Sequence, residues 1–166
     1  MKITKMLTIL SILIFSAVAA RAEYRQVNLT VFGMDCAPCA HAIHVSMKGI
    51  PGVTTVNVDL NTGLVGIKLA PGNHADMHQF NQAVEKNGFT HKDANVVVLG
   101  KITGSTSNLF LEVSGTKDRY ALAPLNPRTN ASSYIGKTVT VEGTIPQAPK
   151  GKVPDTLRYK TITEAQ

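Results

Sequence analysis

After its first 22 residues, the chain carries two stretches that differ in hydrophobic periodicity. Between residues 26 and 93, apolar positions alternate in some segments and recur at helical spacing in others. This pattern predicts, in order, a strand around 27–31, a helix over 36–50, strands around 56–60 and 65–69, a helix over 76–87 and a short strand over 89–93.

Turn residues separate these elements where the pattern requires it. Pro51-Gly52 ends the first helix, and Gly88 ends the second. Asn61-Thr62-Gly63 joins the two middle strands into a hairpin. The resulting strand–helix–strand–strand–helix–strand order is that of a ferredoxin-like split βαβ unit.

The second half of the chain contains strand patterns and turns, with one short helical candidate over 130–135. The predicted strands are 96–103, 109–113, 120–122, 138–145 and 157–162. Five strands with a helix after the third is the order of a small OB-type barrel. We therefore expect an α+β protein with a ferredoxin-like βαββαβ domain over 23–93 and an OB-like β domain over 94–166.

The first 22 residues have the features of a secretory signal peptide. Lys2 and Lys5 precede an apolar run from Met6 to Ala20, and Ala20-Arg21-Ala22 supplies a small-residue cleavage pattern. A retained N-terminal anchor is the alternative. Without Lys2, Lys5 and Arg21, the chain has 14 Lys and Arg against 11 Asp and Glu. This excess is too small to indicate nucleic-acid binding, and we expect a bacterial periplasmic protein.

Residues that bind soft metals are confined to the first half. This half holds every His, both Cys and every Met beyond the signal segment: His41, His44, His74, His78, His91, Cys36, Cys39, Met34, Met47 and Met77. Cys36 and Cys39 fall where the first strand gives way to the first helix. Two thiols at a helix start converge on one point, and the helix N-terminus favours their thiolate forms. Such a pair suits a soft ion such as Cu(I).

The Gly33-Met34-Asp35-Cys36-Ala37-Pro38-Cys39 motif in this βαββαβ order resembles the heavy-metal-associated domain family. This family includes copper chaperones, modules of copper-exporting ATPases and the periplasmic mercuric-ion-binding protein. The resemblance covers residues 26–93. It implies that Cys36 and Cys39 bind the metal, with Met34 a buried supporting residue rather than a ligand. It also places Phe89 beside the metal loop, where many members have Gly-Tyr or Gly-Phe.

Several histidines are weaker candidates for metal ligands. His41 follows Cys39 by two residues on the polar side of the first helix, so solvent exposure is its simpler interpretation. His74 and His78 would form a metal pair only if the second helix extended back to residue 74.

The resemblance implies a non-enzymatic carrier that binds Cu(I) or Hg(II) and passes it on by ligand exchange. Its partners would be metal donors and acceptors, such as a copper or mercury transporter or ATPase. After signal cleavage we expect no stable membrane insertion. Two alternatives remain: a thiol–disulfide redox protein that uses the Cys-Ala-Pro-Cys pair, or an interaction module in which the OB-like half is the functional part.

Overall fold

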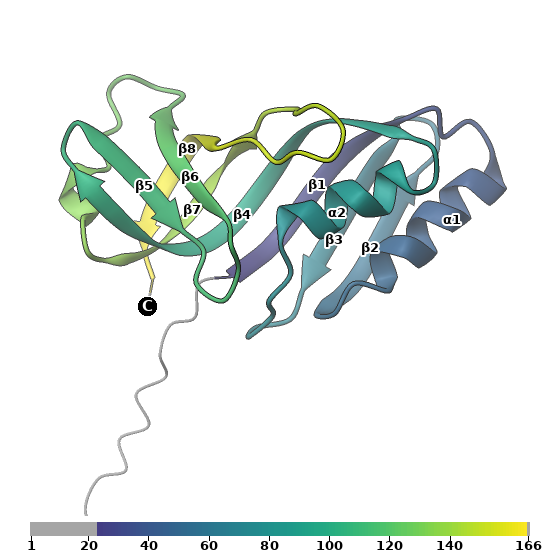
Figure 1. Cartoon of the computed structure of the whole chain (residues 1–166), viewed down its shortest axis with the longest axis horizontal. Coiled ribbons are helices and arrows are strands. Elements are labelled where there is room, and N and C mark those ends of the chain that lie inside the picture. Colours follow the sequence, from purple (N-terminus) through teal and green to yellow (C-terminus); the bar gives the residue numbers. More distant parts are fainter. Residues whose placement is uncertain (1–22, 166) are drawn as a thin grey trace, which may run out of the picture.

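The computed structural model describes residues 23–165, so the predicted signal peptide lies outside the described residues. Its first part has the predicted βαββαβ order. The elements are β1 (Glu23–Phe32), α1 (Ala37–Lys48), β2 (Val53–Asp59), β3 (Leu64–Leu69), α2 (Met77–Glu85) and β4 (Thr90–Ser105). The strands lie antiparallel in the order β2-β3-β1-β4. Both helices cover the same face of this sheet (Figure 1).

The core between helices and sheet follows the hydrophobic periodicity. The α1 residues Ile43 and Met47 are fully buried, as is Phe80 of α2. They pack on the alternating apolar side chains of β1 and its neighbours. At the start of α2, the Asp76 carboxylate accepts a hydrogen bond from the N–H of Gln79, whose side chain accepts one from the N–H of Asp76. This reciprocal cap fixes where α2 begins.

Strand β4 corrects one expectation. The sequence predicts two strands, at 89–93 and 96–103, but the structure has one continuous 16-residue strand. Its register against β1 shifts between the Leu29–Ala94 and Val31–His91 pairs, so Lys92 and Asp93 bulge and both face solvent. A bulge interrupts the two-residue alternation without ending the strand. The predicted domain boundary between residues 93 and 94 therefore falls inside β4.

The remaining four strands pair with one another and, at both ends of the set, with β4. They are β5 (Asn108–Glu112), β6 (Arg119–Pro124), β7 (Thr138–Ile145) and β8 (Thr156–Glu164), with a single 3-10 turn, η1 (Ser132–Tyr134), where a short helix was expected. The pairings β4–β5, β5–β6, β6–β8, β8–β7 and β7–β4 form a ring. Only β6–β8 is parallel. We call these five strands the ring; its assignment as an OB-like barrel stays a prediction.

A buried hydrogen-bond network joins the ring to the βαββαβ part. The hydroxyl of Tyr24 lies 2.6 Å from the hydroxyl of Tyr120 in β6 and donates to the Asp118 carboxylate, also at 2.6 Å. The same Asp118 oxygen accepts the backbone N–H of Met77, the first residue of α2, at 2.9 Å. Burial is the main reason that the pKa values of Tyr24 and Tyr120 are raised. We call Tyr24, Asp118, Tyr120 and Met77 N–H the tyrosine network.

The loop between β7 and β8 makes a second connection. It runs across α2 and the start of β4 (Figure 1). The N–H of Gly151 donates to the Glu85 carboxylate at 3.0 Å, and the N–H of Gln147 donates to Asp93 at 2.8 Å. Asn81 reaches the carbonyl of Lys152 at 3.4 Å. The two parts of the chain are therefore held together at several points besides their shared strand.

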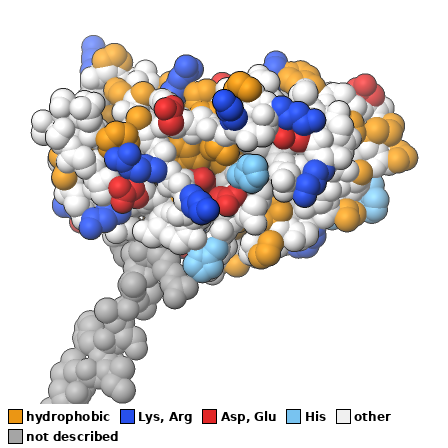
Figure 2. All heavy atoms as spheres, viewed as in Figure 1, with side chains coloured by type: hydrophobic (Ala, Val, Ile, Leu, Met, Phe, Trp, Pro, Cys, Tyr) orange, Lys and Arg blue, Asp and Glu red, His pale blue; other side chains and the backbone are white. Residues whose placement is uncertain are grey.

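The surface drawn in Figure 2 shows basic and acidic side chains interspersed rather than gathered by sign. Within residues 23–165, no helix is long and apolar enough to cross a membrane.

Candidate metal site

The two cysteines lie where the loop after β1 enters α1: Cys36 precedes the helix and Cys39 lies in its first turn. Cys36 is the N-cap residue of α1, and its Sγ accepts a hydrogen bond from the backbone N–H of Cys39 at 3.2 Å. Sulfur thus takes the capping role that an oxygen side chain fills in most helices. Pro38 lies in the first helical turn, where its missing N–H removes no intrahelical hydrogen bond.

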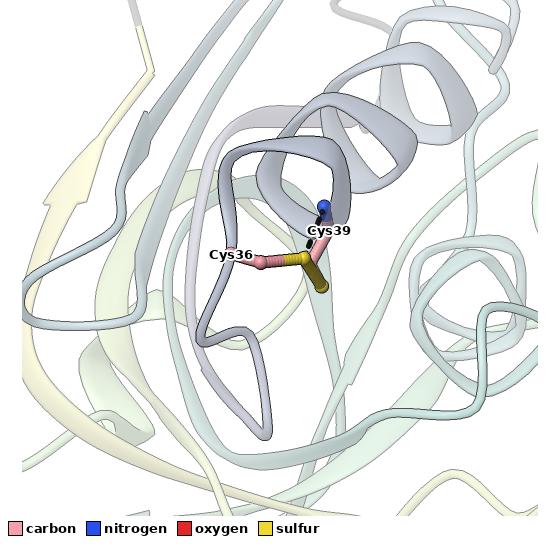
Figure 3. Close-up of a disulfide and its surroundings, with 2 residues drawn as sticks. All are labelled: Cys36 and Cys39. Atoms are coloured by element: carbon pink, nitrogen blue, oxygen red, sulfur yellow. Dashed lines mark hydrogen bonds between the residues drawn. A yellow bond between two sulfur atoms is a disulfide. The ribbon is translucent and has the colours of Figure 1, made fainter.

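The structure closes Cys36 and Cys39 into a disulfide, with their Cα atoms 5.1 Å apart (Figure 3). Cys36 is exposed and Cys39 is half-buried. The helix start thus brings both sulfur atoms to one point at the surface. In the reduced state, the same backbone would present two thiols side by side to an ion or a partner.

The two cysteines lie at the partially positive N-terminus of α1. The first turn of α1 contains no acidic residue, so no carboxylate competes with sulfur for the partial positive charge of the helix N-terminus. That charge lowers the pKa of nearby thiols in general. Asp35, exposed just before Cys36, is the acidic group next to the pair in sequence.

Met34 and Phe89 lie close to the loop that carries Cys36. Met34 is only 3% exposed and belongs to the hydrophobic core. Gly33 has a φ of +82°, and a Cβ at this position would lie 3.5 Å from the Phe89 ring. Phe89 therefore lies against the loop, and its side chain carries no group that can hydrogen-bond to sulfur. The supporting, non-ligand roles of Met34 and Phe89 stay predictions.

The histidine candidates lie outside any assembled site. His41 is exposed on α1 and His44 is half-buried on the same helix. Because α2 begins at Met77, His74 precedes the helix, so the condition for a His74–His78 helical pair is not met. Within residues 23–165, no three His, Cys, Asp or Glu side chains come together as a metal-binding group. The assignment of Cys36 and Cys39 as metal ligands stays a prediction.

Sequence reasoning missed two features, one beside this site and one at the other end of β1. Phe32, the last residue of β1, is 42% exposed, and the Lys92 ammonium lies 4.4 Å from the centre of its ring. The alternation in β1 predicts the exposure of Phe32. Phe32 lies on the same strand face as Asn28 and Thr30, opposite the buried Val31. The tyrosine network was also missed, since it joins residues about a hundred positions apart and no local pattern marks it.

In a comparison with known protein families, residues 28–90 match the heavy-metal-associated domain. The copper-exporting P-type ATPase of Bacillus subtilis (strain 168) is 28% identical over 123 residues. That alignment covers 73% of this chain but only 14% of the ATPase.

Two solved structures are similar over part of the chain. The CopZ metallochaperone is 30% identical, covering 40% of this chain and 97% of that one, with a TM-score of 0.38. Oxidized MerP from Ralstonia metallidurans CH34 is 20% identical, covering 41% of this chain and 93% of that one, with a TM-score of 0.38.

The fold and the site together define a class of small α+β domain that presents a thiol pair at the start of its first helix. The family match assigns this class: residues 28–90 are a heavy-metal-associated domain. The ring that follows lies outside the matched residues.

Proposed function

We propose that this protein is a non-enzymatic carrier that binds one Cu(I) or Hg(II) ion between Cys36 and Cys39 and passes it to a partner. The observation that carries the proposal is the Cys36–Cys39 pair, closed as a disulfide at the N-terminus of α1 within a heavy-metal-associated domain. The signal-like residues 1–22 support a periplasmic location. The similarity to the CopZ metallochaperone supports a carrier role, and the similarity to the Bacillus copper-exporting ATPase supports copper as the ion and an ATPase or other transporter as partner.

Transfer would proceed by ligand exchange at sulfur. Two thiolates leave a soft ion with room for a third ligand, and an exposed loop allows a partner's thiolate to reach it. The incoming thiolate forms a third bond to the ion, and one bond to Cys36 or Cys39 then breaks. No electron is transferred, so the oxidation state of the ion is unchanged.

The disulfide must open before the metal can bind. Its reduction takes two electrons and two protons from a reductant, and metal binding then releases the thiol protons. The periplasm is kept oxidising by dedicated catalysts. A carrier located there needs either a reducing partner or metal that occupies both sulfurs before they are oxidised.

The test is anaerobic titration of the reduced protein with Cu(I) and with Hg(II), read by competition with a chelator. We expect one ion per chain, and loss of tight binding in Cys36→Ser and Cys39→Ser, because a hydroxyl is a harder, largely protonated ligand. His41→Ala is the matched control in the same helix and should bind nearly normally. Unchanged affinity in Cys36→Ser would refute the proposal, and a comparable loss in His41→Ala would make His41 a ligand.

The disulfide also favours a second candidate, a thiol–disulfide redox protein. Catalytic reduction or oxidation of a substrate disulfide, with turnover exceeding one per chain, would support this candidate. Stoichiometric metal binding without such turnover would support the carrier.

A further inference from the structure

An apolar surface lies beside the metal loop, on the sheet face opposite the helices. Six large hydrophobic side chains of residues 23–165 are exposed, and three of them lie at this end of the sheet: Phe32, Leu60 and Leu64, at 42%, 38% and 44% exposure. Leu64 pairs with Thr30 in the neighbouring strand, which makes Phe32 its diagonal neighbour on the same face. Leu60 lies in the adjoining β2–β3 turn.

A free cation adjoins this surface. Lys92 lies over the Phe32 ring and forms no ion pair with any residue of 23–165. The Asp59 carboxylate, at the end of β2, accepts the backbone N–H groups of Asn61 and Thr62. Hydrogen bonding by the Thr62 side chain, followed by the Asn61 N–H, lowers its pKa. Asp93 likewise accepts the N–H of Gln147. Both carboxylates form hydrogen bonds to backbone N–H groups and no ion pair with Lys92. The Lys92 ammonium contacts the Phe32 ring and solvent.

This surface lies so close to the metal loop that a partner bound at the loop would also cover it. Phe32 directly precedes Gly33 of the metal loop, and ligand exchange requires the partner to touch that loop. A specific protein interface covers about 800 Å² on each side, so a partner centred on Cys36 and Cys39 also covers the adjoining Phe32. Buried aromatic residues are frequent energetic centres of such interfaces.

We propose that Phe32, Leu64 and Lys92 form the docking surface for a protein partner whose contact surface is apolar and edged with carboxylates. This inference rests on the proposed carrier function and names the chemistry of its partner. Phe32 and Leu64 supply the apolar contact. Lys92 supplies the charge that selects an acidic partner and steers its approach.

The test measures how fast chelators remove Cu(I) from the reduced, loaded full-length protein. A disulfonated diphenyl phenanthroline presents the chemistry expected of the partner, an aromatic body with anionic groups. A neutral dimethyl phenanthroline binds Cu(I) through the same two nitrogens without the charge. Each variant is compared with the unmodified protein for each chelator, so the difference in chelator affinity cancels.

Lys92→Glu should slow removal by the sulfonated chelator about five-fold at 10 mM ionic strength, where the screening length is about 30 Å. The effect should shrink at 0.15 M salt and stay under about two-fold with the neutral chelator. The matched control is Lys101→Glu, an exposed lysine on the same strand about 30 Å further along it, at roughly 3.3 Å per residue. It should slow the sulfonated chelator much less than Lys92→Glu does, because its charge lies about one screening length further away, and it should leave the rate with the neutral chelator unchanged.

Phe32→Thr should slow both chelators, because both are aromatic, and Leu125→Thr is its control at an exposed leucine just after β6. Circular dichroism of each variant establishes that it is folded. Equal rates in Lys92→Glu and Lys101→Glu would overturn the docking proposal, as would equal slowing of both chelators by Lys92→Glu. Failure of the unmodified protein to bind Cu(I) or Hg(II) would instead overturn the carrier function, and the docking proposal with it.

Discussion

Replacing Asp118 with alanine should lower the free energy of unfolding, because it removes the hydrogen bonds that join the βαββαβ part to the ring. Its Oδ2 accepts two hydrogen bonds, from the Tyr24 hydroxyl at 2.6 Å and from the Met77 N–H at 2.9 Å. A hydrogen bond to a charged group contributes about 1.5–3 kcal/mol to stability. A carboxylate at a helix N-terminus adds about 0.3–1 kcal/mol. Because the Tyr24 hydroxyl keeps its contact with Tyr120, we expect a net loss of about 3–4 kcal/mol.

The assay is equilibrium unfolding in urea of residues 23–166, followed by circular dichroism. Small proteins have m values of about 1–3 kcal/mol/M, so this loss would lower the midpoint by more than about 1 M. Asp118→Asn keeps an acceptor but removes the charge, and should lose about half as much. Glu164→Ala breaks the exposed ion pair with Lys137, 2.8 Å long, and should cost under about 1 kcal/mol. If Asp118→Ala lowers the free energy of unfolding by less than about 1 kcal/mol, the reasoning is refuted. Water would then satisfy the Tyr24 hydroxyl and the Met77 N–H as well as the carboxylate does.

We make three further predictions, about the two tyrosines, the β1–β4 pairing and Met34. Burial raises the pKa values of Tyr24 and Tyr120 above 10, so the folded state retains protons that the unfolded state loses. Stability should fall above pH 10 by up to about 1.4 kcal/mol per pH unit for each tyrosine, a slope that Tyr24→Phe should reduce in alkaline urea titrations. A fragment of residues 23–93 should fail to fold by circular dichroism, because it lacks the Ala94–Leu99 segment that pairs with β1; a cooperative unfolding transition would contradict this. Met34→Leu nearly conserves core volume, so it should cost under about 1.5 kcal/mol and leave Cu(I) affinity nearly unchanged, whereas a sulfur–metal bond from Met34 in absorption spectroscopy would make it a ligand.

The βαββαβ part was predictable because each of its elements has its own local signal. Alternation marks β1, β2 and β3, and Asp76 with Gln79 marks the start of α2. The position of the cysteines at the α1 N-terminus followed directly from the same pattern. These signals are local because each element buries one face against a common core.

The joining of the two halves could not be predicted, because the contacts responsible are distant in sequence. The bulge at Lys92 and Asp93 hides the continuity of β4, since two consecutive exposed residues look like the end of a strand. Tyr24 and Tyr120 are 96 positions apart, and neither position has a local feature that indicates a partner. The ring closes through β4–β7 pairing, which depends on strand order rather than on the pattern of any one strand.

The shared strand limits how the ring contributes to metal transfer. β4 has 16 residues and therefore spans about 50 Å at roughly 3.3 Å per residue. Its first residue, Thr90, pairs with Phe32 beside the metal loop, whereas its last residues pair with β5. A partner covering about 800 Å² around the loop extends only some 15 Å from its centre. The far end of the ring lies beyond that reach, but the β7–β8 loop touches Asp93, next to Lys92. If a partner docks at the metal loop as proposed, the β7–β8 loop, which contacts Asp93, and the end of β7, where Ile145 pairs with Ala94, are the parts beyond the βαββαβ unit that lie nearest to it.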